Sequence, residues 1–369
     1  MSLRVLLKDQ LKFINQYYEV IAVSSDGDGF EQMLEEQGVR GVKINMTRKV
    51  TPFKDLLAIL KLIILFRKEK PDIVHAMTFK AGFLAMIAAW IARVPVRFYS
   101  ICGLAEFSWH NHHLVNLVEK TSCFCATKIY PNSHNLYKIL LKNNLLNPDK
   151  AKVLANGSTN GIDTEYFSPT QVIGERERIR TKFNISDEGF VFCFVGRLVP
   201  DKGINELINA FVDLSKTNSQ IQLMLIGPYE KNIYSLQPQI EEIILTHHGI
   251  HSCGYQEDIR PYLSAADAFV FPSYREGFPN VVMQAGAMGL AAIVSDINGC
   301  NEIIIEGVNG TIVPTKDTKA LSSAMKYFCN NRDSVVKNLA SSARKMIIER
   351  YNRRIIWDEL LKEYNKVFL

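Results

Sequence analysis

Short apolar runs that alternate with helical patterns restrict the fold of this chain more than any other feature of its sequence. In the first half, apolar runs at 72–75, 96–101 and 128–131 each precede a segment with helical periodicity. The alternation begins again at 190–195 and continues to 291–295. Because a strand followed by a helix leads back to a parallel neighbour, the pattern predicts an α/β fold with doubly wound parallel sheets.

A segment rich in Asn, Gly, Pro and Ser, residues 144–175, separates the two runs of alternation. We therefore expect two Rossmann-like domains, residues 1–160 and 161–369, that face each other across a cleft. Each has enough residues to bury a core of its own. The last stretch, 317–367, is predicted to be helical.

The start of the chain is predicted to form a helix over residues 2–18, with leucines at spacings of three and four, and then a strand at 18–24. A turn follows that contains Asp26-Gly27-Asp28. An Asp-x-Asp tripeptide can hold a divalent metal between donor phosphates in one class of sugar transferases. Among these turn-forming residues, a plain turn is favoured.

Charge is distributed unevenly. Residues 1–160 hold 21 Lys/Arg and 13 Asp/Glu, whereas the remainder holds 22 and 25. The basic first half indicates an anionic membrane surface or a diphosphate-bearing acceptor, or else only a solvated basic face. The basic residues are dispersed and carry no nucleic-acid recognition motif. No apolar run is long enough to cross a membrane, and the seven cysteines form no Cys-x-x-Cys pair. We expect no signal peptide and a cytoplasmic location.

The strongest candidate site lies in residues 267–314. There a strand at 268–271 leads through a loop to a helix that opens at Asn280. A helix N-terminus at the carboxyl end of a parallel strand suits a phosphate group. Glu276 in the loop and Gln284 on the helix could hold two parts of one ligand.

Residues 190–210 repeat this construction. The strand at 190–195 ends at Gly196, and Arg197 and Lys202 precede a helix that follows Gly203. Two cations beside a glycine turn at the start of a helix form a suitable clamp for a diphosphate.

These segments, taken together, resemble the family 4 glycosyltransferases, which share the two-domain GT-B fold. The matching motifs are Gly196-Arg197-Leu198, Asp201-Lys202-Gly203, Gly254-Tyr255-Gln256, Pro272-Ser273, Glu276-Gly277-Phe278-Pro279 and Gly307-Val308-Asn309-Gly310. The first half matches more weakly, through Pro71 to His75 and Lys80-Ala81-Gly82.

The resemblance implies a retaining, metal-independent transfer of a sugar from a nucleotide diphosphate to an acceptor hydroxyl, with no cofactor. Arg197 and Lys202 would grip the diphosphate, and Glu276 would bind the hydroxyls of the donor sugar. The last helix would return to the first domain. The other implied donor-binding residues are Gly196, Gly254, Tyr255, Gln256, Gly277, Phe278, Pro279, Asn280, Val281 and Gln284.

Three positions depart from the family pattern. Gln284 stands where the family has a second Glu that binds the ribose, and a Gln carbonyl can still accept from a ribose hydroxyl. Cys102 stands where the family often has a His beside the transferring sugar. The family's first strand would precede Leu3, so we expect the first domain to lack this strand, as in a truncated start. His75, Lys80 and Cys102 are the candidates on the acceptor side.

The leading hypothesis is therefore a hexosyltransferase that uses a nucleotide sugar, most simply a UDP-sugar, in capsule, lipopolysaccharide or other polysaccharide biosynthesis. Its acceptor would be a polyprenyl-diphosphate-linked saccharide or a glycan at the inner membrane face. Two alternatives remain open, a sugar-nucleotide epimerase and a non-catalytic degenerate transferase subunit. A nicotinamide-dependent oxidoreductase is disfavoured because no Gly-x-Gly-x-x-Gly follows a strand.

Overall fold

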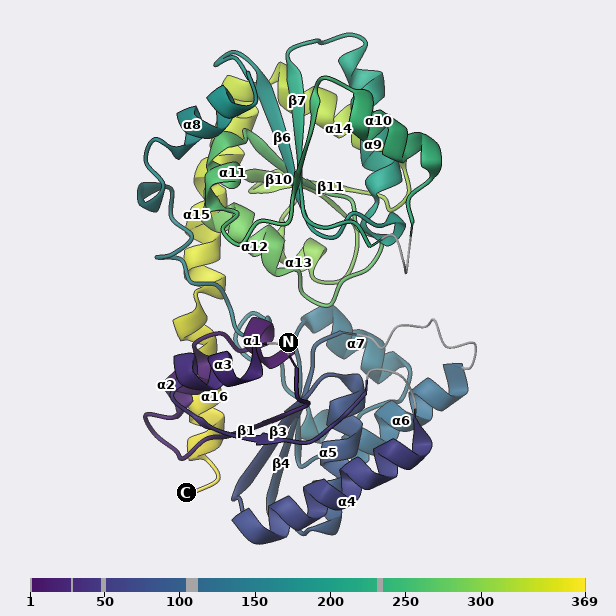
Figure 1. The fold of residues 1–369 in the computed structure, drawn as a ribbon, viewed down its shortest axis with the longest axis vertical. Helices are drawn as coiled ribbons and strands as arrows, with labels where there is room; N and C mark the ends of the chain where they lie inside the picture. Colours follow the sequence, from purple (N-terminus) through teal and green to yellow (C-terminus); the bar gives the residue numbers. More distant parts are fainter. Residues whose placement is uncertain (1, 28, 48–50, 104–111, 231–234, 369) are drawn as a thin grey trace. The chain divides into compact units, whose positions relative to one another are not determined.

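The structure is a computed structural model that describes residues 2–27, 29–47, 51–103, 112–230 and 235–368 (Figure 1). The chain divides into two compact units. Unit 1 comprises Met1–Gly161 with Arg353–Leu369, and unit 2 comprises Ile162–Asn352. Both units are Rossmann-like, with parallel strands joined by helices, as the alternation of apolar runs predicts.

Unit 2 contains a six-stranded parallel sheet in the order β11-β10-β9-β6-β7-β8. Its central strands are buried along their whole length, so they read as continuous apolar runs in the sequence. The strands are β6 (Phe190–Val195), β7 (Ile221–Ile226), β8 (Ile250–Gly254), β9 (Ala268–Phe271), β10 (Ala291–Ser295) and β11 (Gly310–Val313). The helices are α8 (Glu175–Lys182), α9 (Ile204–Ser215), α10 (Pro238–Thr246), α11 (Arg260–Ala265), α12 (Asn280–Ala287), α13 (Cys300–Ile303), α14 (Thr318–Asn330) and α15 (Lys337–Tyr351).

The direction of winding changes between β6 and β9, which are hydrogen-bonded neighbours in this sheet. From β6 the chain passes through α9 to β7, on the side away from β9. From β9 it passes through α12 to β10, on the side away from β6. Loops at the carboxyl ends of two such strands diverge and leave room for a ligand between them.

Unit 1 holds two separate parallel sheets in its described residues. β1 (Ile21–Ser24) pairs with β2 (Arg40–Lys43), and β3 (Ile73–Met77) pairs with β4 (Val96–Ile101), which in turn pairs with β5 (Lys128–Pro131). The helices are α1 (Ser2–Leu6), α2 (Gln10–Ile14), α3 (Phe30–Gln37), α4 (Pro52–Glu69), α5 (Phe79–Ile91), α6 (His112–Cys125), α7 (His134–Lys142) and α16 (Arg353–Asn365).

The end of the chain belongs to unit 1. Trp357 and Leu360 of α16 share an apolar cluster with Phe13 of α2 and with Phe98 of β4. The Phe13 and Trp357 rings are stacked with their centroids 5.1 Å apart. The last helix therefore packs on the first unit, as the family resemblance implied.

The predicted helix over residues 2–18 is wrong in its length. It is two short helices, α1 and α2, interrupted at Asp9, whose φ of 64° lies in the left-handed region. The strand expected at 18–24 is shorter, because β1 begins at Ile21. The final helical stretch is likewise divided into α14, a π-helical turn (Arg332–Val336), α15 and α16.

Candidate active site

The candidate site in unit 2 is built around an ion pair between residues that follow the two central strands. Lys202 ends a short 3₁₀ turn (Pro200–Lys202) after β6, and Glu276 lies in the loop after β9. Lys202 Nζ lies 2.5 Å from Glu276 Oε1, and the two side chains are only 14% and 18% exposed. A cation and a carboxylate thus stand together where the winding of the sheet changes direction.

Contacts between the two loops hold Glu276 in place. The Tyr274 backbone N–H donates to the Asp201 carbonyl over 2.9 Å, which ties the second loop to the first. The Ser273 hydroxyl lies 3.1 Å from Glu276 Oε1 and donates to it. The carboxylate oxygen that faces Lys202 is therefore positioned by a second donor from its own loop.

Two glycines allow these loops to approach closely. Gly203 has a φ of +70°, and a Cβ there would lie 2.1 Å from the Pro272 carbonyl oxygen. A Cβ on Gly299, after β10, would lie 2.7 Å from the Gly277 carbonyl oxygen. The Asn298 amide donates to that same carbonyl over 2.6 Å. The loops after β6, β9 and β10 thus form one packed surface.

Arg197 follows Gly196 at the end of β6 and forms a more exposed ion pair. Its guanidinium lies 2.7 Å from Glu230, a residue in the loop after β7, and the arginine side chain is 40% exposed. A Cβ on Gly227 would lie 1.9 Å from the Gly196 carbonyl oxygen, so only glycine permits this crossing of the two loops. Both predicted diphosphate-binding cations therefore have a carboxylate partner.

The first turn of α12 supplies backbone donors beside Glu276. The N–H groups of Asn280 and Val281 have no acceptor among the described residues, as is usual for the start of a helix. Phe278, nearly buried, packs against Tyr351 at 5.4 Å between ring centroids and fixes the approach to Pro279 and the helix. Gln284 lies one turn further on and is partly buried.

The third predicted segment follows the edge strand β8. The Gly227 N–H donates to the Gly254 carbonyl over 2.8 Å, which links this segment to the loop beside Gly196. Tyr255 is 73% exposed, whereas the Gln256 amide donates to the Cys253 carbonyl over 2.6 Å. The exposed phenol ring next to a glycine offers a flat apolar surface.

The candidates on the acceptor side, all in unit 1, fall into two groups. His75 lies 2.8 Å from the Ser100 hydroxyl and 2.7 Å from the Tyr364 hydroxyl, through its two ring nitrogens. Burial lowers the pKa of His75 to about 4, so its imidazole is neutral at pH 7. The Cys102 thiol also faces the Ser100 residue, 3.9 Å from its carbonyl oxygen, and burial raises its thiol pKa.

Lys80 lies apart from this cluster. Its Nζ is 2.7 Å from Asp55 and 3.0 Å from the Thr47 hydroxyl. Burial alone would raise the pKa of Asp55, but the hydrogen bonds from Lys80 and from Thr51 outweigh it and lower that pKa. Lys80 therefore forms a largely buried ion pair with Asp55.

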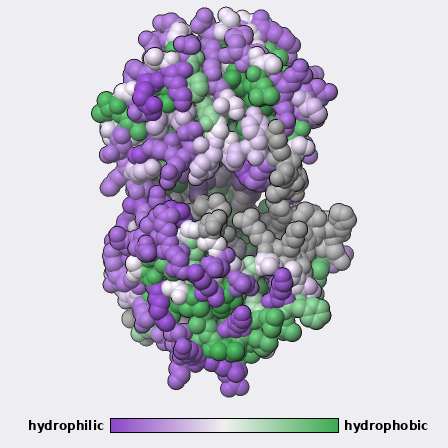
Figure 2. All heavy atoms as spheres, in the orientation of Figure 1, coloured by the Kyte–Doolittle hydropathy of each residue, from purple (hydrophilic) through white to green (hydrophobic). Residues whose placement is uncertain are grey.

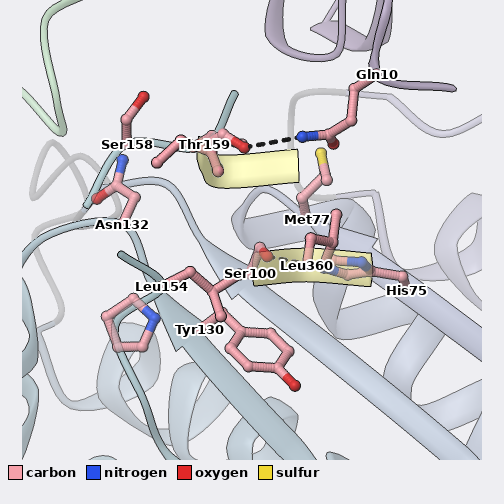
Figure 3. A pocket seen from close by; sticks show the side chains of 12 residues that line it. Gln10, His75, Met77, Ser100, Tyr130, Asn132, Leu154, Ser158, Thr159 and Leu360 are labelled. Atoms are coloured by element: carbon pink, nitrogen blue, oxygen red, sulfur yellow. Dashed lines mark hydrogen bonds between the residues drawn. The ribbon is translucent and has the colours of Figure 1, made fainter. Parts of the chain in front are cut away.

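A small cavity of about 20 Å³ opens between His75 and Ser100 on one side and Asn132, Ser158 and Thr159 on the other (Figure 3). It has room for about one water molecule. Asn132 Oδ1 is buried and has no partner among the described residues, which fits an acceptor for that water. Gln10 and Thr159 both line the cavity, and the Gln10 amide donates to the Thr159 carbonyl over 3.2 Å, the dashed line in Figure 3.

Several residues of the site were not predicted. Glu230, Ser273 and Asn298 contact Arg197, Glu276 and Gly277, respectively. Ser273 lay within a quoted motif, but no local pattern marks Glu230. Of the Asp26-Gly27-Asp28 tripeptide, Asp26 pairs with Lys43 at 3.2 Å, and Asp28 lies outside the described residues.

Comparison with known proteins assigns the family. The chain is 32% identical to the capsular polysaccharide biosynthesis glycosyltransferase CapM of Staphylococcus aureus, over 98% of this chain and 93% of that protein. The chain belongs to the family 4 glycosyltransferases. Residues 175–346 of this transferase match the family described as glycosyl transferases group 1, and residues 4–133 match the family described as glycosyl transferase 4-like.

A second relative agrees with this assignment, and a solved structure agrees with the fold. The transferase is 27% identical to the Escherichia coli UDP-Gal:alpha-D-GlcNAc-diphosphoundecaprenol alpha-1,3-galactosyltransferase, over 95% of this chain and 89% of that protein. Its fold matches that of Anabaena HepE, crystallised in complex with UDP, with a TM-score of 0.80 at 18% identity over 97% and 96% of the two chains. The transferase thus has the GT-B fold.

Proposed function

We propose that this transferase moves a sugar from a UDP-sugar to a hydroxyl of a polyprenyl-diphosphate-linked saccharide, with retention of the anomeric configuration and without a metal or cofactor. The product would be an intermediate in the assembly of a capsule or another cell-surface polysaccharide. The two relatives support this choice through the capsular polysaccharide, UDP-Gal and diphosphoundecaprenol in their names.

The observation that carries the proposal is the Lys202–Glu276 ion pair at the ends of β6 and β9. A bound diphosphate offers Lys202 stronger acceptors than one carboxylate, so Lys202 would turn to the phosphates. Glu276 would then accept hydrogen bonds from the hydroxyls of the donor sugar. The bound donor would thus replace the Lys202–Glu276 ion pair with one contact from Lys202 to the diphosphate and another from Glu276 to the sugar.

The reaction needs stabilisation of charge on the leaving phosphate. When the bond between the anomeric carbon and the phosphate oxygen breaks, negative charge grows on UDP. Lys202, Arg197 and the N–H groups at the start of α12 would face that charge, as fixed donors that favour the transition state. The acceptor oxygen bonds to the anomeric carbon on the same face, and its proton passes to the departing phosphate oxygen.

The acceptor class is supported by the surface of unit 1. Helices α4, α5 and α6 lie side by side (Figure 1). Large apolar side chains are exposed on all three helices. Figure 2 shows such side chains gathered over α4. We define the α4–α6 face by its exposed apolar residues, Phe53, Leu56, Leu57, Leu60, Ile64, Trp90, Ile91, Leu114, Leu117 and Phe124.

Exposed cations lie beside this face. Lys54, Lys61, Arg67 and Lys68 are exposed on α4 itself. An apolar face flanked by Lys and Arg is suited to lie in the interface of a bilayer that contains anionic lipids. None of the helices in the described part of the chain has the length and apolar character needed to span a bilayer. A peripheral position at the inner membrane face would bring the enzyme to a lipid-linked acceptor.

An assay with defined substrates tests the proposal. The purified chain is incubated with UDP-hexoses and a water-soluble polyprenyl-diphosphate N-acetylglucosamine, with and without EDTA. We expect acceptor-dependent release of UDP, a product with the α configuration from an α donor by NMR, and no effect of EDTA. An inverted product, or activity lost in EDTA and restored by Mn²⁺, would contradict the mechanism.

Vesicle co-sedimentation tests the membrane part separately. Vesicles of phosphatidylglycerol and phosphatidylethanolamine should bind the wild type. The Leu57→Glu/Leu60→Glu variant should bind them weakly while its UDP affinity stays unchanged. Equal sedimentation of both proteins would rule out the α4–α6 face as the membrane contact.

A further inference from the structure

A second side-chain contact, besides the Lys202–Glu276 ion pair, joins the loop after β9 to the segment that follows β6. The Tyr274 hydroxyl donates a hydrogen bond to Glu206 Oε2 over 2.6 Å. Tyr274 lies in the same loop as Glu276, two residues before it. Glu206 lies in the first turn of α9, four residues after Lys202. This bond therefore links the same two segments without using either residue of the ion pair.

The bond between Tyr274 and Glu206 is of a strong type. A hydroxyl that donates to a carboxylate forms a charge-assisted hydrogen bond, and 2.6 Å lies within the short range that is typical of such bonds. Both residues are partly buried, so water competes less for them than at an open surface. Burial, and after it the bond to Glu206, raises the pKa of the Tyr274 hydroxyl. The phenol therefore keeps its proton, and remains a donor, around neutral pH.

Other contacts fix the position of Tyr274. Its backbone N–H donates to the Asp201 carbonyl over 2.9 Å, so the backbone and the hydroxyl of this residue are both attached to the segment after β6. Lys316, in the turn after β11, places its Nζ 4.8 Å from the centroid of the Tyr274 ring, which attracts a cation. The neighbouring Arg275 also contacts Asp201, but over 3.4 Å and with a side chain that is 46% exposed.

The Tyr274–Glu206 bond gains importance when the ion pair opens. A donor that draws Lys202 to its diphosphate takes from Glu276 its partner in the segment after β6. The Ser273 hydroxyl still contacts Glu276, but it belongs to the same loop and cannot hold that loop against β6. The bond from Tyr274 to Glu206 can do so, because neither residue is needed to bind the donor.

We propose that Tyr274 and Glu206 are positioning residues for the transfer. Their hydrogen bond keeps Glu276 aligned with the diphosphate site after the donor has opened the ion pair with Lys202. In the free protein the ion pair holds the two segments as well, so the bond has little effect there. With the donor bound, the bond controls kcat and leaves the affinity for UDP unchanged. This kinetic consequence rests on the proposed function, whereas the structural consequence requires no donor.

Amide hydrogen exchange on the ligand-free chain tests the structural consequence. Lys202→Ala removes the ion pair, as a donor would, and Tyr274→Phe removes the hydroxyl but keeps the ring that contacts Lys316. The probe is the backbone N–H of residue 274, which donates to Asp201. We expect Tyr274→Phe to speed its exchange by roughly tenfold or more in the Lys202→Ala background, and by much less when Lys202 is present. Equal exchange in Lys202→Ala and in the double variant would overturn the proposal.

Kinetics test the positioning role. We expect Tyr274→Phe to lower kcat by about tenfold to a hundredfold, the usual effect of losing a hydrogen bond to a charged group, with UDP affinity changed by less than about twofold. Tyr327→Phe, at a tyrosine of α14 that is 51% exposed, is the matched control and should change neither quantity. Adding Tyr274→Phe to Glu276→Ala should lower kcat no further, because Tyr274 acts through that carboxylate.

The acceptor side of the bond gives a second set of variants. Glu206→Gln keeps an acceptor oxygen and should retain more of the wild-type kcat than Glu206→Ala does. A wild-type kcat in Tyr274→Phe, or a further fall when this change is added to Glu276→Ala, would overturn the proposal. A wild-type chain that transfers no sugar would instead contradict the proposed function, and the exchange experiment would still decide whether the Tyr274–Glu206 bond holds the loop.

Discussion

Lys202 and Glu276, 74 residues apart in the sequence, form a 2.5 Å ion pair at the carboxyl ends of the two central strands of unit 2. The pair is shielded, with both side chains less than a fifth exposed. A donor that binds here has to separate the two charges and satisfy each of them. We therefore expect donor binding and donor positioning to be coupled through these two residues.

Replacing Glu276 with Ala should separate nucleotide binding from transfer. The variant keeps Lys202 and removes its competing carboxylate, so we expect UDP to bind at least as tightly as to the wild type. The transfer rate should fall by about a hundredfold, because a charge-assisted contact to the donor sugar contributes roughly 2–3 kcal/mol. Calorimetric titration with UDP and kcat measurements on the same preparation check both halves. An equal loss of UDP affinity and of kcat would place Glu276 on the nucleotide instead.

Gly203→Ala should damage the site through the backbone. The new Cβ would lie 2.1 Å from the Pro272 carbonyl oxygen, at a φ of +70°. Gly289 is a matched control, because its φ is +79° and a Cβ there meets nothing within 4 Å. We expect Gly289→Ala to cost only the strain of a positive φ, about 1–2 kcal/mol, and Gly203→Ala to cost more and to weaken UDP binding. Similar unfolding free energies and UDP affinities for the two variants would show that the close contact with Pro272 is unimportant.

Asp267 should be the most sensitive charged position in unit 2. It accepts hydrogen bonds from Arg176, Arg180 and Arg332, and the Arg180 side chain is only 3% exposed. Burial lowers the pKa of Arg180, which shows the cost of enclosing that guanidinium. Asp267→Ala leaves it without its carboxylate and should destabilise unit 2 by about 3–5 kcal/mol.

The control for Asp267 is Asp213→Ala, which breaks an exposed pair with Lys216. Its effect should stay within about 0.5 kcal/mol. Urea unfolding followed by circular dichroism compares the variants. A loss below about 1 kcal/mol for Asp267→Ala would contradict this account of the arginine cluster.

His75 should make unit 1 less stable in mild acid. Its pKa is about 4 in the folded protein and has an ordinary value of 6.5, so the unfolded chain binds the proton first. The contribution of neutral His75 to the free energy of unfolding is therefore fully present above pH 6.5. This contribution, about 1–3 kcal/mol, is lost as the pH falls from 6.5 towards 4. The His75→Gln variant lacks this component, so its unfolding free energy should fall less over the same range. Parallel pH dependences of the two proteins would contradict the shift.

The sequence predicted the fold of unit 2 well because its strands are buried on both faces. β6, β9 and β10 begin and end at the predicted residues, since each is a continuous apolar run bounded by a glycine or a polar turn. The start of unit 1 was harder. The break at Asp9 between α1 and α2 could not be predicted from hydrophobic periodicity, because the leucines on either side keep their helical spacing.

The sequence marks the residues of the candidate site individually but does not predict their pairing. Arg197, Lys202 and Glu276 were marked by strand ends, glycines and the family motifs. Their partners depend on loops far apart in the sequence, as in the contact of Arg197 with Glu230 across the β6 and β7 loops. The division of the strands of unit 1 into two sheets likewise depends on how the strands pair, which no local pattern specifies.

The central claim is that the ends of β6 and β9 bind the diphosphate of the donor, and calorimetric titration of UDP into three proteins tests it most directly. These are the wild type, Lys202→Ala and Lys216→Ala, the last a lysine on the surface of the same unit that pairs only with Asp213 in the described structure. We predict that the wild type and Lys216→Ala bind UDP equally and that Lys202→Ala binds it about a hundredfold more weakly. Equal affinity in all three proteins would contradict the claim.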